Sequence, residues 1–446
     1  MTPSTETRAR ISPQQVHETL RRHMLTDGFE MVLDLEKSQG SWLFDSLSQR
    51  EFLDFFTSFS SYPMGYNHPK MKDPEFRERI LLAATMKPSN SDLYTTQMAE
   101  FVEIFSGTLP PAFRGHLFFI SGGALAVENA LKTAFDWKVQ KNLRTGRGEK
   151  GTKVLHFQGA FHGRSGYTLS LTNTDPTKTR YFPKFDWPRV STPGLRFPLT
   201  DEILAETAEA EERSIREIEA AFRDHPHEIA AIIIEPIQGE GGDKHFRGEF
   251  LRALRSLADE NDALLIFDEI QTGFGTTGRY WCFEHFDVEP DLFAFGKKTQ
   301  VCGIASSNRV DEVDSVFRVS SRINSTWGGN LVDMIRCQRF VEIIQEDELL
   351  ANAADQGKRL LRGLRTIAEG HEGMTNARGR GLFVAFDLPD GAVRKRVLDN
   401  LREQGLLGLP CGPRSIRFRP PLVVTAEEID EALDRVETVA GEVLPG

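Results

Sequence analysis

Short apolar segments alternate with long amphipathic segments through the middle of the chain, and this alternation limits the possible folds strongly. Five apolar segments have the length of strands, and four other segments repeat apolar residues at helical spacing. Strands that are apolar on both faces and separated by helices are typical of a mostly parallel sheet covered on both sides. The expected strands are 117–120, 154–157, 229–234, 263–267 and 292–295, and the expected helices are 96–105, 124–142, 201–222 and 247–260.

The two ends of the chain have a different pattern. Short strand-like pieces separated by Gly and Ser fill 30–59 and predict a small meander. Before it, Ser12, Pro13 and Gln15 have the order of a helix cap, and residues 1–10 are expected to be a frayed tail. After Asn330, charged helical patterns surround two short strands. These are the helices 346–368, 392–404 and 426–443 and the strands 382–386 and 415–418.

We therefore expect an α/β protein of two domains. A large domain, 67–326, holds the mostly parallel sheet of about seven strands between helices. A smaller α+β domain combines 1–66 with 327–446. A length of 446 residues agrees with two or three domains, and the change of pattern after Asn330 makes two the better interpretation.

Charge and cysteine usage exclude several classes of partner. The chain has 54 Lys and Arg against 65 Asp and Glu, a net charge of −11, so neither nucleic acid nor an anionic membrane is expected as its main partner. No apolar run approaches the ~18 residues of a membrane-spanning helix, and no secretory signal is visible. The four cysteines are widely spaced, without a C-x-x-C pair, so we expect no metal site, no disulfide framework and a cytoplasmic location.

The first candidate for chemistry is an acid at the end of a buried strand. The segment 264–278 reads LLIFDEIQTGFGTTG, in which Asp268 follows four apolar residues and a Gly- and Thr-rich turn follows Asp268. In an open α/β sheet, ligands lie beyond the carboxyl ends of the strands, so an acid there faces the ligand. A cap of the next element is the alternative role for a strand-end aspartate.

The second candidate is a lysine at the end of the next strand. The segment 291–298 reads DLFAFGKK, so Gly296 and two lysines follow an apolar strand. A lysine at the mouth of an apolar sheet is partly desolvated, which lowers its pKa and makes it a better nucleophile. An acid that holds a ring nitrogen and a lysine that forms a Schiff base are the minimum for pyridoxal 5'-phosphate (PLP) chemistry. Lys297 and Lys298 both qualify.

A third segment has the order that a phosphate site needs. Ser121, Gly122 and Gly123 follow the strand 117–120 and precede a helical pattern that begins near Ala124. Backbone N–H groups at a helix N-terminus bind phosphate. An ordinary tight turn is the alternative for a Gly-Gly pair alone.

Together with six further motifs, these segments resemble the class III aminotransferases, a family of fold-type I PLP-dependent transferases. The resemblance covers nearly the whole chain. The motifs are SQGSWLFD (38–45), GYNHP (65–69), FHGR (161–164), EPIQGEG (235–241), TWGGN (326–330) and RFRPPL (417–422).

The resemblance implies the residues that bind the cofactor. Asp268 would pair with the pyridine N–H, and Lys297, which directly follows the small residue Gly296, would form the Schiff base and move the proton. Thr326 would reach the phosphate from a neighbouring subunit, which implies a homodimer with a shared site. The full cofactor-binding set is Gly123, Ala124, Phe161 (stacked on the ring), His162, Asp268, Gln271 (near the 3-hydroxyl), Lys297 and Thr326.

The substrate residues implied by the resemblance are Arg164, Glu240, Gln271 and Arg417. Arg417 would bind the carboxylate beside the keto carbon of 2-oxoglutarate, and Glu240 would neutralise Arg417 when the amino donor is bound. Arg164 would hold the distal carboxylate. A structural ion pair is the alternative for either arginine, and Glu235 is expected to be structural.

Within the family, the motifs are most similar to those of the bacterial lysine 6-aminotransferases. The implied reaction moves the ε-amino group of L-lysine to 2-oxoglutarate, giving 2-aminoadipate 6-semialdehyde and L-glutamate. A 4-aminobutyrate or ornithine-type ω-aminotransferase is the alternative. The phosphate-loop segment 122–125 lacks the cysteines that bind an iron–sulfur cluster in animal 4-aminobutyrate aminotransferases, so no cluster is expected. The segment 301–308 lies beside the reactive lysine, and its effect on substrate preference is open.

Overall fold

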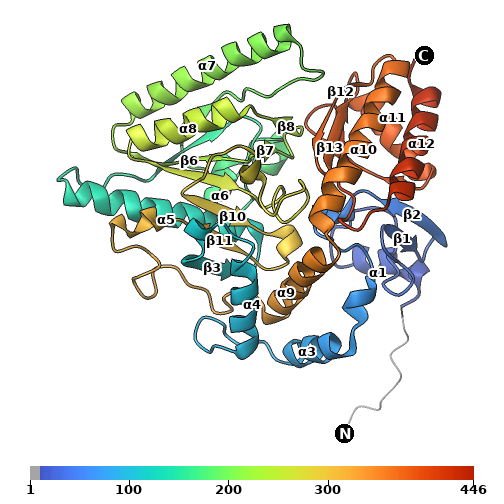
Figure 1. The fold of residues 1–446 in the computed structure, drawn as a ribbon, viewed down its shortest axis with the longest axis horizontal. Coiled ribbons are helices and arrows are strands. Elements are labelled where there is room, and N and C mark those ends of the chain that lie inside the picture. Colours follow the sequence, from blue (N-terminus) through green and yellow to red (C-terminus); the bar gives the residue numbers. More distant parts are fainter. Residues whose placement is uncertain (1–10, 446) are drawn as a thin grey trace.

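The computed structural model describes residues 11–445, and its centre is a seven-stranded sheet (Figure 1). The strand order is β3-β11-β10-β9-β6-β4-β5, and β11 alone runs antiparallel to its neighbours. The mostly parallel α/β sheet expected from the sequence is therefore confirmed. The strands are β3 (His116–Ile120), β4 (Lys153–Phe157), β5 (Arg189–Val190), β6 (Ile229–Ile234), β9 (Leu264–Asp268), β10 (Leu292–Phe295) and β11 (Cys302–Ser306).

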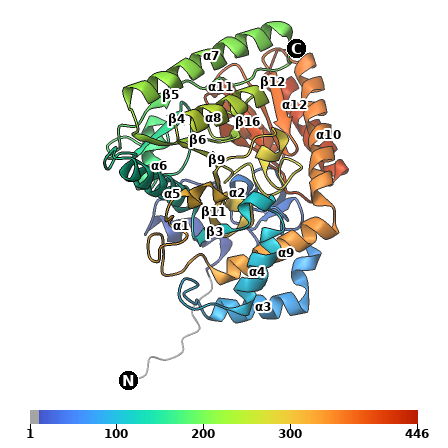
Figure 2. The same ribbon diagram turned by 60° about the vertical axis from the view of Figure 1, so that its left-hand side comes forward.

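The two faces of this sheet belong to two apolar cores, because successive side chains of a strand point to opposite faces. In β9, Leu265 and Phe267 pack in one core, and Leu264 and Ile266 pack in the other. Helix α5 (Gly123–Arg144) covers the second face, while α4 (Thr96–Ser106) and α8 (Gly248–Glu260) cover the first. Figure 2 shows the sheet between these helices, with α7 (Asp201–Asp224) outside α8.

Two smaller sheets contain the C-terminal strands. One has the order β12-β13-β16-β15, and in the other β14 pairs in parallel with β2 of the antiparallel hairpin β1-β2. The N-terminal hairpin and the C-terminal segment thus share one sheet. The strands are β1 (Trp42–Asp45), β2 (Arg50–Asp54), β12 (Thr375–Arg380), β13 (Phe383–Asp387), β14 (Leu406–Leu407), β15 (Leu409–Cys411) and β16 (Ser415–Phe418).

Long helices pack beside these sheets, as the orange and red ribbons of Figure 1 show. They are α10 (Leu349–Gly370), α11 (Gly391–Glu403) and α12 (Ala426–Val443). The remaining elements are α1 (Val16–Arg21), α2 (Thr57–Ser60), α3 (Pro74–Thr85), α6 (Gly166–Leu171), α9 (Leu331–Glu346) and the hairpin β7 (Ile237–Gln238) with β8 (Lys244–His245).

Three local expectations differ from the structure. The only strands of the expected meander 30–59 are β1 and β2, because 30–41 makes isolated bridges rather than a ladder and α2 begins at Thr57. The expected helix 346–368 begins at Leu349, and the separate helix α9 before it was missed. Strands β5 and β11 of the central sheet were also missed, and β11 completes the sheet between β3 and β10.

The chain begins as the sequence predicts where it is described. Ser12 and Gln15 form a capping box, with the Ser12 N–H donating to Gln15 Oε1 at 3.0 Å, and Pro13 opens the first turn before α1. The tail expected at 1–10 lies outside the described residues. Within residues 11–445, no helix combines the length and the apolar character that crossing a membrane requires.

Candidate active site

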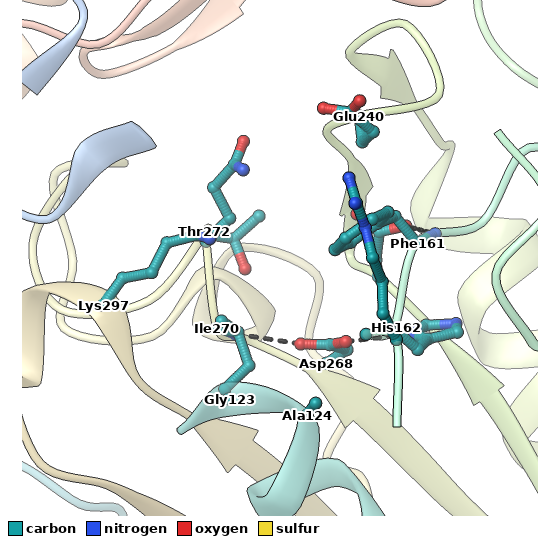
Figure 3. A pocket seen from close by; sticks show the side chains of 13 residues that line it. Gly123, Ala124, Phe161, His162, Glu240, Asp268, Ile270, Thr272 and Lys297 are labelled. Atoms are coloured by element: carbon teal, nitrogen blue, oxygen red, sulfur yellow. Dashed lines mark hydrogen bonds and ion pairs between the residues drawn. The ribbon is translucent and has the colours of Figure 1, made fainter. Parts of the chain in front are cut away.

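The carboxyl ends of β3, β4, β6, β9 and β10 meet at one edge of the central sheet, because these strands are parallel. The residues that follow these ends surround a cavity of about 310 Å³ (Figure 3). This is the position at which open α/β sheets bind ligands. The lining residues are Gly123, Ala124, Phe161, His162, Gly163, Arg164, Glu235, Glu240, Asp268, Ile270, Gln271, Thr272 and Lys297.

Asp268 lies at the base of the cavity between His162 and Ile270 (Figure 3). It is the last residue of β9 and is 5% exposed. Its Oδ2 is 2.7 Å from Nδ1 of His162, and its Oδ1 accepts a hydrogen bond from the Ile270 N–H at 3.1 Å. Two partners on opposite oxygens fix the orientation of this carboxylate in the cavity.

The two adjacent lysines have different surroundings. Lys297 lines the cavity, and its backbone has a φ of +52°, a left-handed conformation that is strained for a residue with a side chain. Burial lowers the pKa of Lys297, and the nearby Arg417 adds to that effect. Lys298 is fully buried elsewhere, and its ammonium donates to the Gln271 carbonyl at 2.6 Å and to Ser60 at 3.2 Å. Of the two, only Lys297 lines the cavity.

Helix α5 begins at the cavity wall. Gly122 precedes it with a φ of +102°, and Gly123 and Ala124 are its first residues and line the cavity. The space around them is tight, because a Cβ on Gly163 would lie 2.6 Å from the Cβ of Ala124. The first N–H groups of a helix have no partner within the helix, so those of Gly123 and Ala124 are available to an anion in the cavity.

Two arginines flank the cavity. Arg417 is buried in β16, and its Nη2 lies 2.7 Å from Oε2 of Glu240, while its Nη1 donates to Gln271 Oε1 at 3.2 Å. Burial alone would raise the pKa of Glu240, but Arg417 and Lys178 together hold it below its usual value. Arg164 is exposed at the cavity, and it makes no salt bridge with any of residues 11–445.

Comparisons with known proteins identify the family of this chain. The sequence profile of the family described as "Aminotransferase class-III" matches residues 25–440. The chain belongs to the class III aminotransferases.

Individual members of the family are similar over nearly the full length. This aminotransferase is 52% identical to the L-lysine-epsilon aminotransferase of Mycobacterium tuberculosis over 431 residues, 96% of this chain and 95% of that protein. The solved structure of the lysine aminotransferase from M. tuberculosis in the internal aldimine form has a TM-score of 0.95 at 51% identity, with 97% and 100% of the two chains covered. The human mitochondrial 4-aminobutyrate aminotransferase is 33% identical, with 92% and 85% covered.

Class III aminotransferases depend on PLP, and the cavity of this aminotransferase fits that cofactor. The cavity has a volume of about 310 Å³, and its lining includes an oriented carboxylate, a lysine of lowered pKa and the N-terminus of a long helix. The ring of Phe161 forms the wall opposite Lys297 (Figure 3).

Glu235 follows β6 and lies in the same cavity wall. Its Oε1 accepts from the Phe161 N–H at 3.1 Å and its Oε2 from the Gly239 N–H at 3.0 Å. Burial raises the pKa of Glu235 to about 7. This carboxyl group ties two loops of the site together, which agrees with the structural role expected for it.

One residue of the predicted cofactor-binding set does not line the cavity of this single chain. Thr326 is exposed in the loop before α9, and its carbonyl oxygen accepts from Ser89 Oγ at 2.5 Å. The other predicted cofactor residues all line the cavity.

Some residues of the site were not predicted. Ile270 and Thr272 line the cavity, and the only available signal was their place beside Gln271 in the segment 264–278. Lys178 contacts Glu240 at 2.6 Å, but it lies outside every motif and had no sequence signal.

Proposed function

We propose that this chain transfers the ε-amino group of L-lysine to 2-oxoglutarate and releases 2-aminoadipate 6-semialdehyde and L-glutamate. The observation that carries the proposal is the Glu240–Arg417 ion pair at the cavity that contains Lys297. An arginine that a glutamate can neutralise suits an enzyme that must accept a dicarboxylate and an amino donor in turn. The 52% identity to a lysine aminotransferase, against 33% to a 4-aminobutyrate aminotransferase, favours lysine as the donor.

In this proposal, bound PLP supplies the electron sink for the carbanion that forms when the donor loses a proton. Asp268 would hold the pyridine N–H, with His162 orienting the carboxylate, and Phe161 would stack on the ring. The first N–H groups of α5, at Gly123 and Ala124, would bind the phosphate, and Gln271 would serve the 3-hydroxyl.

Lys297 is the residue that we assign to covalent attachment and to proton transfer. Burial lowers the pKa of its ammonium, so a neutral amine is available at a lower pH than for an exposed lysine. With PLP and the donor bound, Nζ of Lys297 would take the proton from Cε of the donor. The semialdehyde product then cyclises, because its free α-amino group can attack its own aldehyde.

Arg417 and Arg164 bind different carboxylates of the substrates in this proposal. Arg417 binds the carboxylate beside the keto carbon of 2-oxoglutarate, with Gln271 at its side, and Glu240 occupies Arg417 during the lysine half-reaction. Arg164, which has no carboxylate partner among residues 11–445, holds the distal carboxylate in both half-reactions.

We further propose a homodimer in a reducing cytoplasm. The exposed position of Thr326 supports the dimer, because this residue can reach a phosphate only in another protomer's cavity if its assigned role is correct. The four buried free cysteines agree with a reducing compartment.

Isotope labelling tests the position of transfer. L-Lysine labelled with ¹⁵N at the ε-amino group should pass its label to glutamate, while lysine labelled at the α-amino group should pass none. The label is read by mass spectrometry of the glutamate formed. Label transfer from the α position would contradict the proposed function.

A further inference from the structure

The carboxylate of Glu240 is shared between two cations, although its proposed role, to neutralise Arg417 when lysine is bound, requires only Arg417. Its Oε2 lies 2.7 Å from Arg417, and its Oε1 lies 2.6 Å from Nζ of Lys178. Arg417 is 1% exposed, while Glu240 and Lys178 are 26% and 18% exposed. The second cation is therefore closer to solvent than the first.

The backbone on both sides of the Glu240 side chain is held by hydrogen bonds. The Glu240 carbonyl accepts from the Gly412 N–H at 2.9 Å, and the Gly239 N–H donates to Glu235 at 3.0 Å. Only rotation of the side chain is needed to separate Glu240 from Arg417.

Lys178 is itself fixed in position. It ends the short turn Pro176–Lys178, which Asp175 caps by accepting from the Thr177 N–H at 2.8 Å. Its Nζ lies 3.3 Å from Thr174 Oγ1 and 5.5 Å from the centroid of the Phe161 ring. The ammonium is thus held at the cavity wall and does not swing freely in solvent.

We propose that Lys178 is a positioning residue that keeps Glu240 ion-paired after the carboxylate of the amino acceptor has displaced it from Arg417. The inference rests on the proposed function. A carboxylate that leaves a buried guanidinium without another partner would be desolvated and unpaired, which is unfavourable. Lys178 already contacts one oxygen of Glu240, so Glu240 keeps a charged partner both when it is paired with Arg417 and after the acceptor has displaced it. Removing Lys178 should therefore bind Glu240 more firmly to Arg417 and oppose entry of the acceptor.

The test compares Lys178→Met with Lys178→Arg and measures each half-reaction alone by the absorbance of the cofactor. Lys178→Met should raise the apparent dissociation constant of 2-oxoglutarate about tenfold, and leave that of lysine within about twofold. Lys178→Arg should restore most of the loss, since it keeps the charge. Equal loss in both half-reactions, or no loss in either, would overturn the inference. Lys178→Gln serves if the methionine variant does not fold.

A double-mutant cycle separates positioning from direct contact with substrate. In the Glu240→Ala background there is no carboxylate for Lys178 to receive, so Lys178→Met should have no further effect on 2-oxoglutarate. If the tenfold loss persists in that background, Lys178 contacts the substrate itself and the inference fails.

Titration with glutarate, a dicarboxylate that cannot react, gives a readout besides activity. By calorimetry, Lys178→Met should weaken glutarate binding to the holoenzyme about tenfold. Glutarate that binds the wild type and the variant equally contradicts the role of Lys178. Glutarate that does not bind the wild type contradicts the proposed acceptor instead, so the two failures are distinguishable.

Discussion

Lys297 and Lys298 are neighbours in the chain and occupy different chemical environments. Both have a pKa lowered first by burial, but Lys298 donates to the Gln271 carbonyl and to Ser60, whereas the Lys297 side chain makes no such bond to any residue in the described range 11–445. The left-handed backbone at Lys297 turns the chain between them. Only the first of these two adjacent lysines is therefore placed to act on a ligand in the cavity.

Replacement of these lysines should have distinct effects. Lys297→Ala is expected to lower kcat by about 10²–10⁴-fold, because it removes the group assigned to proton transfer, and to abolish the absorbance of the Schiff base with the protein. Lys298→Met should keep that absorbance and lower stability by about 1–3 kcal/mol, because the Gln271 carbonyl loses its donor. Absorbance spectra and thermal unfolding check both. A Lys297→Ala enzyme that keeps the Schiff base would refute the assignment.

Glu269, next to Asp268, should make stability depend on pH. Burial raises its pKa from 4.5 to about 8, so the folded protein holds this proton more tightly than the unfolded chain. Its contribution to stability is complete below about pH 4.5 and is lost as the pH rises through about 8. Glu269→Gln cannot ionise, so the melting temperature of the variant should rise relative to the wild type between about pH 5 and about pH 9. Parallel pH profiles of the two proteins would contradict this expectation.

At the scale of elements, the strands of the parallel sheet were predictable because they are apolar on both faces. β6 and β10 have the expected bounds, and β9 begins and ends one residue later than expected. β11 was not predictable, because Cys302–Ser306 is short, contains Gly303 and has one partner, β3, that is distant in sequence. Helix α9 was missed because its hydrophobic residues, such as Met334 and Phe340, are buried almost all round and give no amphipathic period.

The meeting of Gly163 with the start of α5 gives a prediction for that element. A Cβ on Gly163 would lie 2.6 Å from the Cβ of Ala124, and its φ is +125°, so Gly163→Ala should displace the first turn of the helix. We expect the dissociation constant of PLP to rise about tenfold, equivalent to about 1.4 kcal/mol. Gly148→Ala is the control, since Gly148 has a φ of +80° but open space around it. Equal effects of the two changes on PLP binding, measured by fluorescence titration, would show that backbone strain alone is responsible.

At the scale of the whole molecule, the site combines segments far apart in the sequence. Arg417 in β16 reaches Glu240 in the β7–β8 turn. Arg417 and Arg164 could be chosen as candidates from the sequence because they lie in family motifs. Lys178 could not, because its turn has no motif and its contact with Glu240 depends on tertiary folding. The domain boundaries 67–326, 1–66 and 327–446 stay a prediction, which the shared sheet of β2 and β14 supports.

Mixed dimers test the proposal that Thr326 acts on the partner's cavity. Thr326→Val alone should weaken PLP binding about tenfold, because a hydrogen bond to a charged phosphate is lost. In a mixed dimer of Lys297→Ala and Thr326→Val protomers, the site with Lys297 receives Thr326 from its partner. Half of the sites should therefore form the Schiff base with wild-type affinity. Weak binding at every site of the mixed dimer would place Thr326 in its own protomer's site or in none.

The central claim is that the cavity with Lys297, Arg417 and Glu240 serves an ε-amino donor and a dicarboxylate acceptor. The most direct measurement is kcat/KM for a panel of amino donors with 2-oxoglutarate, since specificity is the ratio of these constants. We predict that L-lysine exceeds L-ornithine and 4-aminobutyrate by at least about tenfold, a difference of about 1.4 kcal/mol in transition-state binding. A value for ornithine or 4-aminobutyrate equal to or above that for lysine would contradict the account.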